Sequence, residues 1–504
     1  MKKIILAAIL TLTACSRMLA YDFEAINADG VTIYYNRLSS SMCEVTYGTT
    51  PYQGEIRIPE TVTYAGADFM VKSIGDRAFW SCHELNAVSV PSSVTYIGEG
   101  AFVWCTSLTK TEYASIEHFC SIDYNCMNSN PLYWSKHLYI NGKEVTEIEI
   151  PNSITTIKPH TFQDCIHLTS VTIPQSVTSI KDYAFYGCSA LTSVKIPDSV
   201  KEIHYYAFAG CSSLTEIDIP NSVNHLLDGA FSDCSSLTSV TLPKNIGEIC
   251  NFLFQNCSSL NSIVIGNHIR SIGIEAFYEC ESLTSVEIQD CVKSIDMYAF
   301  SGCTSLTSIV IPSSVTSLDA YVFNGCSSLT SIEFGKGITQ IKDKTFFRCS
   351  SLSSIQIPEG ITYIGKAAFA ECGMLATVEL PNSLTEIKEN AFGYCDALTK
   401  VKVYAQEPPL VDHSSSYYFE DAFIYNGNTI AMTLMVPAGT REKYEAADVW
   451  KDFEHIIEFD PASLTAVSYD APDTPAFDLM GRKLSDNESR HGLIIQNGKI
   501  RVLR

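Results

Sequence analysis

The chain has 504 residues, and 34 lysine and arginine residues against 56 aspartate and glutamate residues give it a net charge of −22 at pH 7. Because 46% of its residues are apolar and only 18% are charged, it can bury a large core, which excludes an intrinsically disordered protein. The acidic charge repels polyphosphate, so nucleic acid is excluded as a partner of any segment that is not locally basic. Only about the last 30 residues are basic.

The N-terminal segment, residues 1–20, is typical of a signal peptide, since two lysines precede a short apolar run from Ile4 to Leu12. That run is about half as long as the roughly 20 residues that a membrane-spanning helix needs. Two cleavage sites are open. Residues 12–15 resemble a bacterial lipobox, which would make Cys15 a lipidated N-terminus, whereas cleavage after Ala20 would leave a soluble chain. Both alternatives predict export from the cytosol.

The central part of the chain repeats every 23 residues. Cysteine marks the repeat at Cys82, Cys105, Cys165, Cys188, Cys211, Cys234, Cys257, Cys280, Cys303, Cys326, Cys349, Cys372 and Cys395, and a phenylalanine stands three residues before each of them. The step from Cys105 to Cys165 is 60 residues, which is one period plus an insertion of 37. A fixed period of this length predicts a stack of thirteen similar units.

One unit, Leu168–Ala190, reads LTSVTIPQSVTSIKDYAFYGCSA. Val171 and Ile173 alternate with polar residues, which predicts a strand with one buried face, and Pro174 ends it because proline cannot donate to a strand ladder. The Ala-Phe-x-x-Cys spacing suits a single helical or 3₁₀ turn. Since one unit cannot bury its own apolar edge, units must stack. The fold class is therefore a mostly β repeat solenoid of about thirteen 23-residue coils, with a parallel strand ladder and short helical or 3₁₀ turns.

This repeat resembles the BspA-like family of leucine-rich repeat surface proteins. The resemblance implies a β-rich N-terminal cap over residues 21–75, a leucine-rich repeat solenoid over 76–404 with an insertion at 113–145, and a C-terminal cap over 405–460. Members of the family are largely exported or surface proteins of Gram-negative anaerobes. The resemblance therefore implies adhesion or binding of host proteins, without enzymatic activity.

The C-terminal residues have a different pattern. Residues 461–476 are expected to be a linker, and alternating apolar residues on both sides of a polar turn predict a hairpin over 477–504. The hairpin resembles the last strands of sorting domains that the type IX secretion system recognises. Its two interpretations are a sorting tag or a terminal hairpin that caps the fold.

The 19 cysteines of an exported chain favour disulfides, but thirteen of them occupy one repeat position. We therefore expect a ladder of free, inward thiols that behave as small apolar groups. Cys120 and Cys126 in the insertion are the best candidates for a disulfide. Cys43, Cys250 and Cys291 lie outside the ladder and are expected to fill core positions.

No motif predicts catalysis or a cofactor. Gly360–Ala367 is similar to a phosphate-binding loop but lacks the Ser or Thr that holds magnesium, and the repeat register explains its residues. The eleven histidines are scattered, so the sequence predicts no metal site. No nucleophile with a positioned base can be named, and we expect a protein that is not an enzyme.

Specificity must come from positions that vary between coils. The middle residue of the Val-x-Ile strand is expected to face outward, and the series also includes Ser89, Glu149 and Lys402 at its ends. Its central members form the candidate ligand face: Thr172, Lys195, Asp218, Thr241, Val264, Glu287, Val310, Glu333, Gln356 and Glu379. The acidic half from Glu287 to Glu379 favours a protein ligand with basic patches. The alternative is a solvated polar face without a partner.

A second series precedes the Ala-Phe pair of the repeat. This candidate aromatic edge consists of Tyr183, Tyr206, Phe252, Tyr298 and Tyr321. Exposed aromatic side chains can anchor proteins or stack on sugars, but they can equally cover the edge and pack on the next coil. Tyr417, Tyr418 and Phe419 form a third, less regular aromatic patch.

The sequence thus favours an exported binding protein at the outer-membrane surface or outside the cell. The leading function is an adhesin for host matrix or plasma proteins, or for other microbial surfaces. A glycan-binding accessory protein and a structural envelope protein without a soluble ligand are the alternatives. We expect no cofactor and no nucleic acid, and contact with a membrane only through a lipid anchor or surface sorting.

Overall fold

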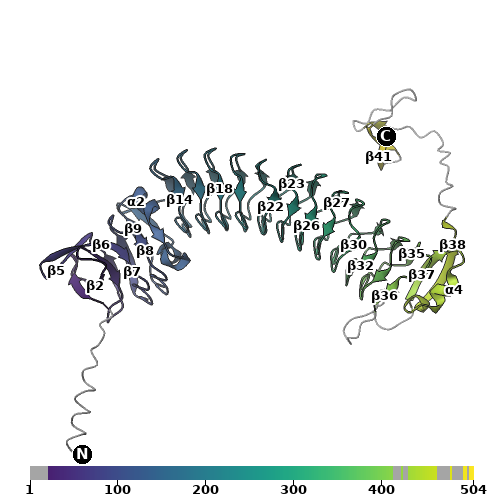
Figure 1. Cartoon of the computed structure of the whole chain (residues 1–504), viewed down its shortest axis with the longest axis horizontal. Helices are drawn as coiled ribbons and strands as arrows, with labels where there is room; N and C mark the ends of the chain where they lie inside the picture. The colour runs from purple at the N-terminus through teal and green to yellow at the C-terminus, as the bar shows by residue number, and fades with distance from the viewer. Residues whose placement is uncertain are drawn as a thin grey trace, which may run out of the picture.

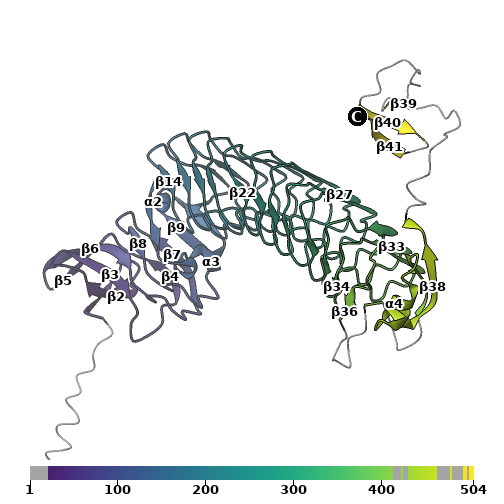
Figure 2. The ribbon, with the colours of Figure 1, turned by 45° about the vertical axis from the view of Figure 1, so that its right-hand side comes forward.

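The computed structural model describes residues 21–412, 422–423, 430–461, 477–478, 492–496 and 499–503. The predicted signal peptide with Cys15 and the patch Tyr417–Phe419 lie outside the described residues, as does most of the predicted linker. Between the N-terminal cap and the C-terminal strands, the coils stack side by side into a curved arch (Figure 1). The same stack is seen obliquely in Figure 2.

The N-terminal cap is a small sheet that continues into the solenoid. Its strands are β1 (Phe23–Ile26), β2 (Thr32–Arg37), β3 (Met42–Thr46), β5 (Thr61–Tyr64) and β6 (Ala67–Ile74). β2 pairs antiparallel with β1 and with β3, and β5 pairs antiparallel with β6. β6 pairs parallel with β3 on one side and with the solenoid strand β8 on the other. The cap therefore covers the first coil by extending its ladder.

Most coils contribute one strand to each of two parallel ladders, as the Val-x-Ile alternation predicts. The first ladder contains β4 (Gly54–Arg57), β7 (Leu85–Val90), β9 (Lys110–Tyr113), β11 (Leu138–Ile140), β13 (Glu147–Glu149), β15 (Ser170–Thr172), β17 (Ser193–Lys195), β19 (Glu216–Asp218), β21 (Ser239–Thr241), β23 (Ser262–Ile265), β25 (Ser285–Ile288), β27 (Ser308–Ile311), β29 (Ser331–Phe334), β31 (Ser354–Gln356), β33 (Thr377–Leu380) and β35 (Lys400–Val403). Each paired residue lies opposite its equivalent in the next coil, as Val171 lies opposite Val194.

The second ladder consists mainly of two-residue strands. These are β8 (Tyr96–Ile97), β10 (Asp123–Tyr124), β14 (Thr156–Ile157), β16 (Ser179–Ile180), β18 (Glu202–Ile203), β20 (His225–Leu226), β22 (Glu248–Ile249), β24 (Ser271–Ile272), β26 (Ser294–Ile295), β28 (Ser317–Leu318), β30 (Gln340–Ile341), β32 (Tyr363–Ile364), β34 (Glu386–Ile387) and β36 (Leu410–Val411). In the segment similar to a phosphate-binding loop, Ile364 of β32 and Ile361 just before this strand are both buried, as the repeat register requires.

A column of stacked aromatic rings runs through the core. Phe185 is 0% exposed, and its ring centroid lies 4.9 Å from that of Phe162 and 5.0 Å from that of Phe208. The solenoid has about 16 turns rather than the thirteen counted from the repeat. Turns without the full consensus place Tyr52, Phe119 and Phe423 against the neighbouring phenylalanines of the column, and this explains the difference.

The thirteen repeat cysteines form the expected ladder of free thiols. The thiol of one coil donates to the phenylalanine carbonyl of the coil before it, as Cys188 Sγ does to Phe162 O at 3.1 Å. Burial raises the pKa of the Cys234 thiol to about 12. Cys120 and Cys126 are not joined in the structure: Cys120 is buried, and the Cys126 thiol lies 3.3 Å from Ser129 Oγ.

The Ala-Phe-x-x-Cys segment forms tight turns with hydrogen bonds of the 3₁₀ type, one of the two forms that its spacing predicts, but no continuous helix. Alternate N–H groups bond within the turn and to the next coil: Cys188 N–H donates to Phe185 O at 3.2 Å, whereas Phe185 N–H donates to Ala207 O at 2.7 Å. A helix would use both groups within itself. The left-handed backbone of Tyr183, at φ 56°, prevents a helix here.

The insertion adds to the ladders instead of looping away from them. It contains α2 (Ile116–Ser121), β10, η1 (Met127–Ser129), α3 (Leu132–Ser135), β11 and β12 (Lys143–Glu144). β10 pairs parallel with β8, β11 pairs parallel with β9, and β12 turns back antiparallel on β11. The insertion is therefore an enlarged coil with the β11–β12 hairpin at its end.

The C-terminal end of the solenoid is covered by β37 (Ile430–Pro437), α4 (Arg441–Ala446), η2 (Trp450–Asp452) and β38 (Phe453–Phe459). β37 pairs parallel with β35 and with β38, so the first ladder continues into this region. The Trp450 indole is fully buried and donates to Pro409 O at 2.8 Å. Farther along the chain, β39 (Phe477–Asp478), β40 (Gly492–Gln496) and β41 (Lys499–Leu503) pair antiparallel.

Candidate functional site

The structure brings most of the candidate ligand face to the solvent side of the first ladder. Pairing places Thr172 opposite Lys195, Asp218 opposite Thr241, Val264 opposite Glu287, Val310 opposite Glu333, and Gln356 opposite Glu379. Nine of these ten side chains are exposed, and Glu379 is half-buried. Neighbouring strands of a sheet lie about 4.8 Å apart. The paired members are therefore close enough for one ligand to contact several of them.

Two members of this face are apolar although they point into solvent. Val264 is 61% exposed and Val310 is 53% exposed. Each lies beside an exposed carboxylate on the next strand, Glu287 and Glu333 respectively. The middle of the candidate ligand face thus alternates apolar and acidic side chains, a pattern that neither folding nor solvation requires.

The C-terminal end of the series is covered by the chain itself. The Lys402 side chain is only 8% exposed, and its Nζ lies 4.7 Å from the ring centroid of Tyr404 and 4.6 Å from that of Phe459. The Tyr404 hydroxyl also donates to Glu379 Oε2 at 3.2 Å. Glu379 and Lys402 therefore take part in closing the solenoid, and the accessible face ends near Gln356.

A hollow of about 800 Å³ lies over β17, β19 and β21 on the same face. Its lining includes Lys195, Asp218 and Thr241 from the candidate ligand face, together with Glu216 and Lys244. Side chains of both charges surround it, so it suits a polar or zwitterionic partner surface better than an apolar small molecule. The hollow adds depth to a face that the sequence predicted only as a row of residues.

The candidate aromatic edge is used within the solenoid. All five side chains are half-buried. The Tyr183 ring is stacked between His160, at 5.3 Å, and Tyr206, at 5.4 Å, and the rings of Tyr298 and Tyr321 lie 4.5 Å apart. Ring faces that stack on neighbouring coils are not available to a sugar, so these four tyrosines contribute to packing between coils.

Two exposed tryptophans near the N-terminal end were not singled out from the sequence. Trp80 and Trp104 are each 54% exposed, and the Trp104 ring lies 6.3 Å from the ring of Trp134 in α3. A hollow of about 480 Å³ lies between Trp80 and the segment Tyr47–Tyr52. The signal was available, because three of the four tryptophans fall between residues 80 and 134.

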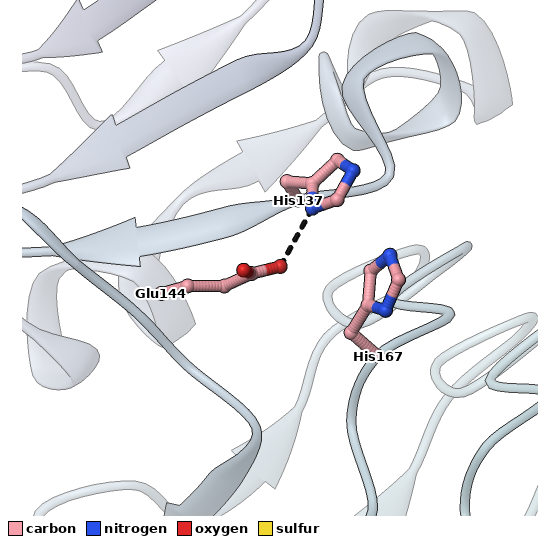
Figure 3. Close-up of side chains that lie close together, drawn as sticks. All are labelled: His137, Glu144 and His167. Atoms are coloured by element: carbon pink, nitrogen blue, oxygen red, sulfur yellow. Dashed lines mark hydrogen bonds and ion pairs between the residues drawn. The ribbon is translucent and has the colours of Figure 1, made fainter.

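The structure also gathers histidines that the sequence leaves scattered. His137 precedes β11, Glu144 belongs to β12, and His167 lies in the turn before β15; one ligand atom of each lies within 4.8 Å of the others (Figure 3). The His137 and Glu144 side chains are joined by a 2.6 Å contact between Nδ1 and Oε1. The sequence shows no sign of this cluster, because only the β11–β12 hairpin brings together residues that are far apart in the repeat pattern.

Within the described part of the chain, no helix is long and apolar enough to cross a membrane. A family model described as a BspA type leucine rich repeat region matches in six copies, over residues 55–139, 133–261, 225–351 and 293–423. No curated protein matches the chain.

Several solved structures are similar to this chain. A leucine-rich repeat protein from Bacteroides ovatus is 26% identical with a TM-score of 0.49, and the match covers 87% of this chain and 100% of that one. A leucine rich cell surface protein from Faecalibacterium prausnitzii is 27% identical with a TM-score of 0.45, over 76% and 95% of the two chains. The pneumococcal vaccine antigen PcpA is 12% identical with a TM-score of 0.39, over 87% and 99%.

Proposed function

The chain belongs to the family of BspA type leucine-rich repeat proteins, and from this premise we propose that it is an exported surface protein that binds other proteins. The proposed role is that of an adhesin for host matrix or plasma proteins, or for the surface of another microbe. Binding uses the candidate ligand face and involves no chemical step. A rigid ladder suits this role because it holds many weak contacts in fixed positions at no cost in ordering.

The observation that carries the proposal is the contrast between the exposed and the buried residues of the same strands. In β23 and β25 the inward positions hold Ile263, which is buried, and Val286, which is partly buried, whereas the outward positions next to them hold the exposed Val264 and Glu287. The inward residues keep one chemistry from coil to coil, while the outward ones vary in charge and polarity. Packing in the core accounts for the constant inward residues only. The identity of the outward residues can therefore reflect the binding of a ligand.

The chemistry of the face indicates the kind of ligand. Protein interfaces combine an apolar centre with charged residues that set orientation and specificity. Val264 and Val310 supply exposed apolar surface, and Glu287 and Glu333 supply negative charge beside it. A partner protein with an apolar patch flanked by lysine or arginine is complementary to this arrangement.

Affinity capture tests the proposal directly. Residues 21–504 are immobilised and exposed to serum, matrix extract and mucus, in parallel with a variant that carries Glu287→Lys and Glu333→Lys. The control variant carries Glu248→Lys and Glu281→Lys, which are exposed but lie in the shorter ladder and in a turn. Because both variants change the net charge by the same amount, any difference between them reports position and not overall charge.

We expect a protein that is retained by the parent chain and the control but lost by the face variant. Equal retention by all three would place binding elsewhere on the molecule. Capture of glycans alone would contradict a protein ligand, and absence of any captured molecule would favour a structural envelope protein.

Export is proposed from the sequence of residues 1–20. The two cleavage alternatives differ in mature mass, because processing at Cys15 adds lipid and cleavage after Ala20 does not. The antiparallel strands β39–β41 are consistent with a sorting tag over residues 477–504, which would be removed on export. Mass spectrometry of the mature protein from both the membrane and the soluble fractions of the native cells measures both ends at once.

A further inference from the structure

The junction between the insertion and the first coil that follows it contains a cluster with metal-binding chemistry. We propose that His137, Glu144 and His167 bind a divalent transition-metal ion of the zinc class and that the ion ties the β11–β12 hairpin to the solenoid. This inference does not depend on the proposed adhesin function, since the cluster lies outside the candidate ligand face.

The types of ligand atom identify the class of metal. The cluster offers two imidazole nitrogens and one carboxylate oxygen. Zinc and its neighbours in the first transition row favour this mixture, whereas calcium and magnesium require mostly oxygen ligands. Three protein ligands also leave one position of a tetrahedral site for water, or for a side chain of a bound partner.

The distances require only a small adjustment. The three ligand atoms lie within 4.8 Å of one another, and a tetrahedral zinc site with bonds near 2.1 Å separates its ligands by about 3.4 Å. Glu144 and His167 are exposed and His137 is partly exposed, so rotation of the side chains can close this difference without moving the backbone. The cluster thus resembles an open site that a metal ion would draw together.

The backbone on both sides of the cluster is already held in place. Lys136 Nζ contacts Asp164 Oδ1 at 2.8 Å, which connects the residue before His137 to the turn that contains His167. On the other side, Thr169 N–H donates to Thr146 O at 2.7 Å. These contacts fix the hairpin relative to the coil. The backbone of the three ligand residues is therefore already in place, and only their side chains need to rotate when the ion binds.

The contacts of the two imidazoles are also consistent with a ligand pair. Their ring centroids lie 4.4 Å apart with an interplanar angle of 23°. In the part of the chain that the structure describes, the His167 ring makes this contact and no hydrogen bond, although both of its nitrogens are polar. Coordination through His137 Nδ1 breaks the contact between Nδ1 and Glu144 Oε1, and the neutral ring then carries its proton on Nε2.

A bound ion would connect two segments at the point where the insertion interrupts the repeat. The insertion interrupts the 23-residue register, so its hairpin lacks the ladder of identical neighbours that supports the other coils. A metal ion would add bonds between residues 137, 144 and 167 at this junction. It would therefore stabilise the folded chain by an amount that grows with the logarithm of the ratio of the ion concentration to its dissociation constant.

The test uses residues 21–504 freed of metal with a chelator. Zinc binding is measured by titration calorimetry, and cobalt(II) absorption reports the ligand types. The variants are His167→Ala and Glu144→Gln, and the control is His225→Ala, another exposed histidine in the shorter ladder. Circular dichroism and melting of the metal-free variants verify that each is folded, as expected for exposed substitutions.

We expect one zinc ion per chain, a cobalt spectrum without thiolate charge-transfer bands, and a melting temperature that rises with zinc. Removal of an outer-shell partner of a metal ligand already costs about 10- to 100-fold in affinity, so His167→Ala should weaken binding by more than about 100-fold. His225→Ala should leave it unchanged. Zinc binding that is absent from the parent, unaffected in His167→Ala, or accompanied by thiolate bands would overturn the proposal.

Discussion

The inward and outward sides of the same coil follow different rules. On the inward side each residue packs on its own equivalent one coil away, as Phe277 does on Phe254 at 5.7 Å and on Phe300 at 5.2 Å. On the outward side Val264 lies next to Glu287, and the two have no chemistry in common. The comparison teaches that the repeated inward residues stabilise the fold, because one packing arrangement can be used in coil after coil. The outward residues can vary for recognition without disturbing this packing.

The largest effect should follow from breaking the inward column. Phe277→Ala removes a fully buried ring that touches the rings of both neighbouring coils. We expect a loss of about 3–5 kcal/mol in the free energy of unfolding, with the two halves of the array losing their coupling. Urea unfolding followed by circular dichroism measures this. An unchanged single transition would contradict the assigned register.

Alkaline pH should act on the whole thiol ladder. Burial raises the pKa of Cys326 to about 12 from its ordinary value of 9.0, and the pKa of its equivalents is raised in the same way. The unfolded chain releases these protons first, so stability is complete below pH 9 and falls as the pH rises toward 12, by up to about 1.4 kcal/mol per thiol and pH unit.

Denaturation at a series of pH values between 8 and 12 checks the alkaline effect, with native-state alkylation as the control. The buried thiols should resist the alkylating reagent at pH 8 and react after unfolding. Rapid alkylation of the repeat cysteines in the native protein would show that the ladder is open to solvent.

A smaller effect is expected where the turns meet the aromatic edge. Gly229 has a left-handed backbone, at φ +64°, and a Cβ built on it would lie 2.3 Å from the Tyr206 ring. Gly229→Ala should therefore destabilise the protein by about 1–2 kcal/mol. Gly247→Ala is the matched control, since nothing lies within 4 Å of its added Cβ. Thermal unfolding of the two variants should separate them, and equal melting temperatures would argue against the close packing of Tyr206.

The smallest effect on stability should come from the candidate ligand face. Thr172→Ser and Glu287→Lys alter exposed side chains, and the only hydrogen bond of the Glu287 side chain among the described residues is an exposed one from Gln289, so each substitution should change the free energy of unfolding by no more than about 0.5 kcal/mol. Chemical denaturation verifies this. A loss above 2 kcal/mol would mean that the face is structural after all.

The periodic features of the fold could be predicted because each repeated residue meets a copy of itself. Once the 23-residue period is known, the neighbours of Phe185 and Cys188 can be predicted, because they are the equivalent residues of the adjacent coils. The choice between a helical and a 3₁₀-type turn could not be predicted, because the Ala-Phe-x-x-Cys spacing suits both, and only the hydrogen bonds to the next coil exclude a continuous helix. The number of coils was underestimated because Tyr52, Phe119 and Phe423 fill the aromatic position without the rest of the motif.

In the candidate site, too, the periodic features could be predicted from the sequence and the other contacts could not. The outward position of Thr172 or Val264 follows from strand alternation, whereas the burial of Lys402 depends on Phe459, which no repeat pattern relates to it. The cluster of His137 and His167 depends on the hairpin that ends the insertion. Contacts that are neither periodic nor local in the sequence leave no signal in it.

Site-specific photocrosslinking tests the central claim most directly. A photoreactive amino acid replaces Val264 in one variant, Val310 in a second and Glu281 in a third, and each is illuminated in the presence of the captured ligand. The account predicts covalent adducts to one protein from positions 264 and 310 and none from position 281. Adducts from position 281 alone, or none from the candidate ligand face while the ligand remains bound, would contradict it.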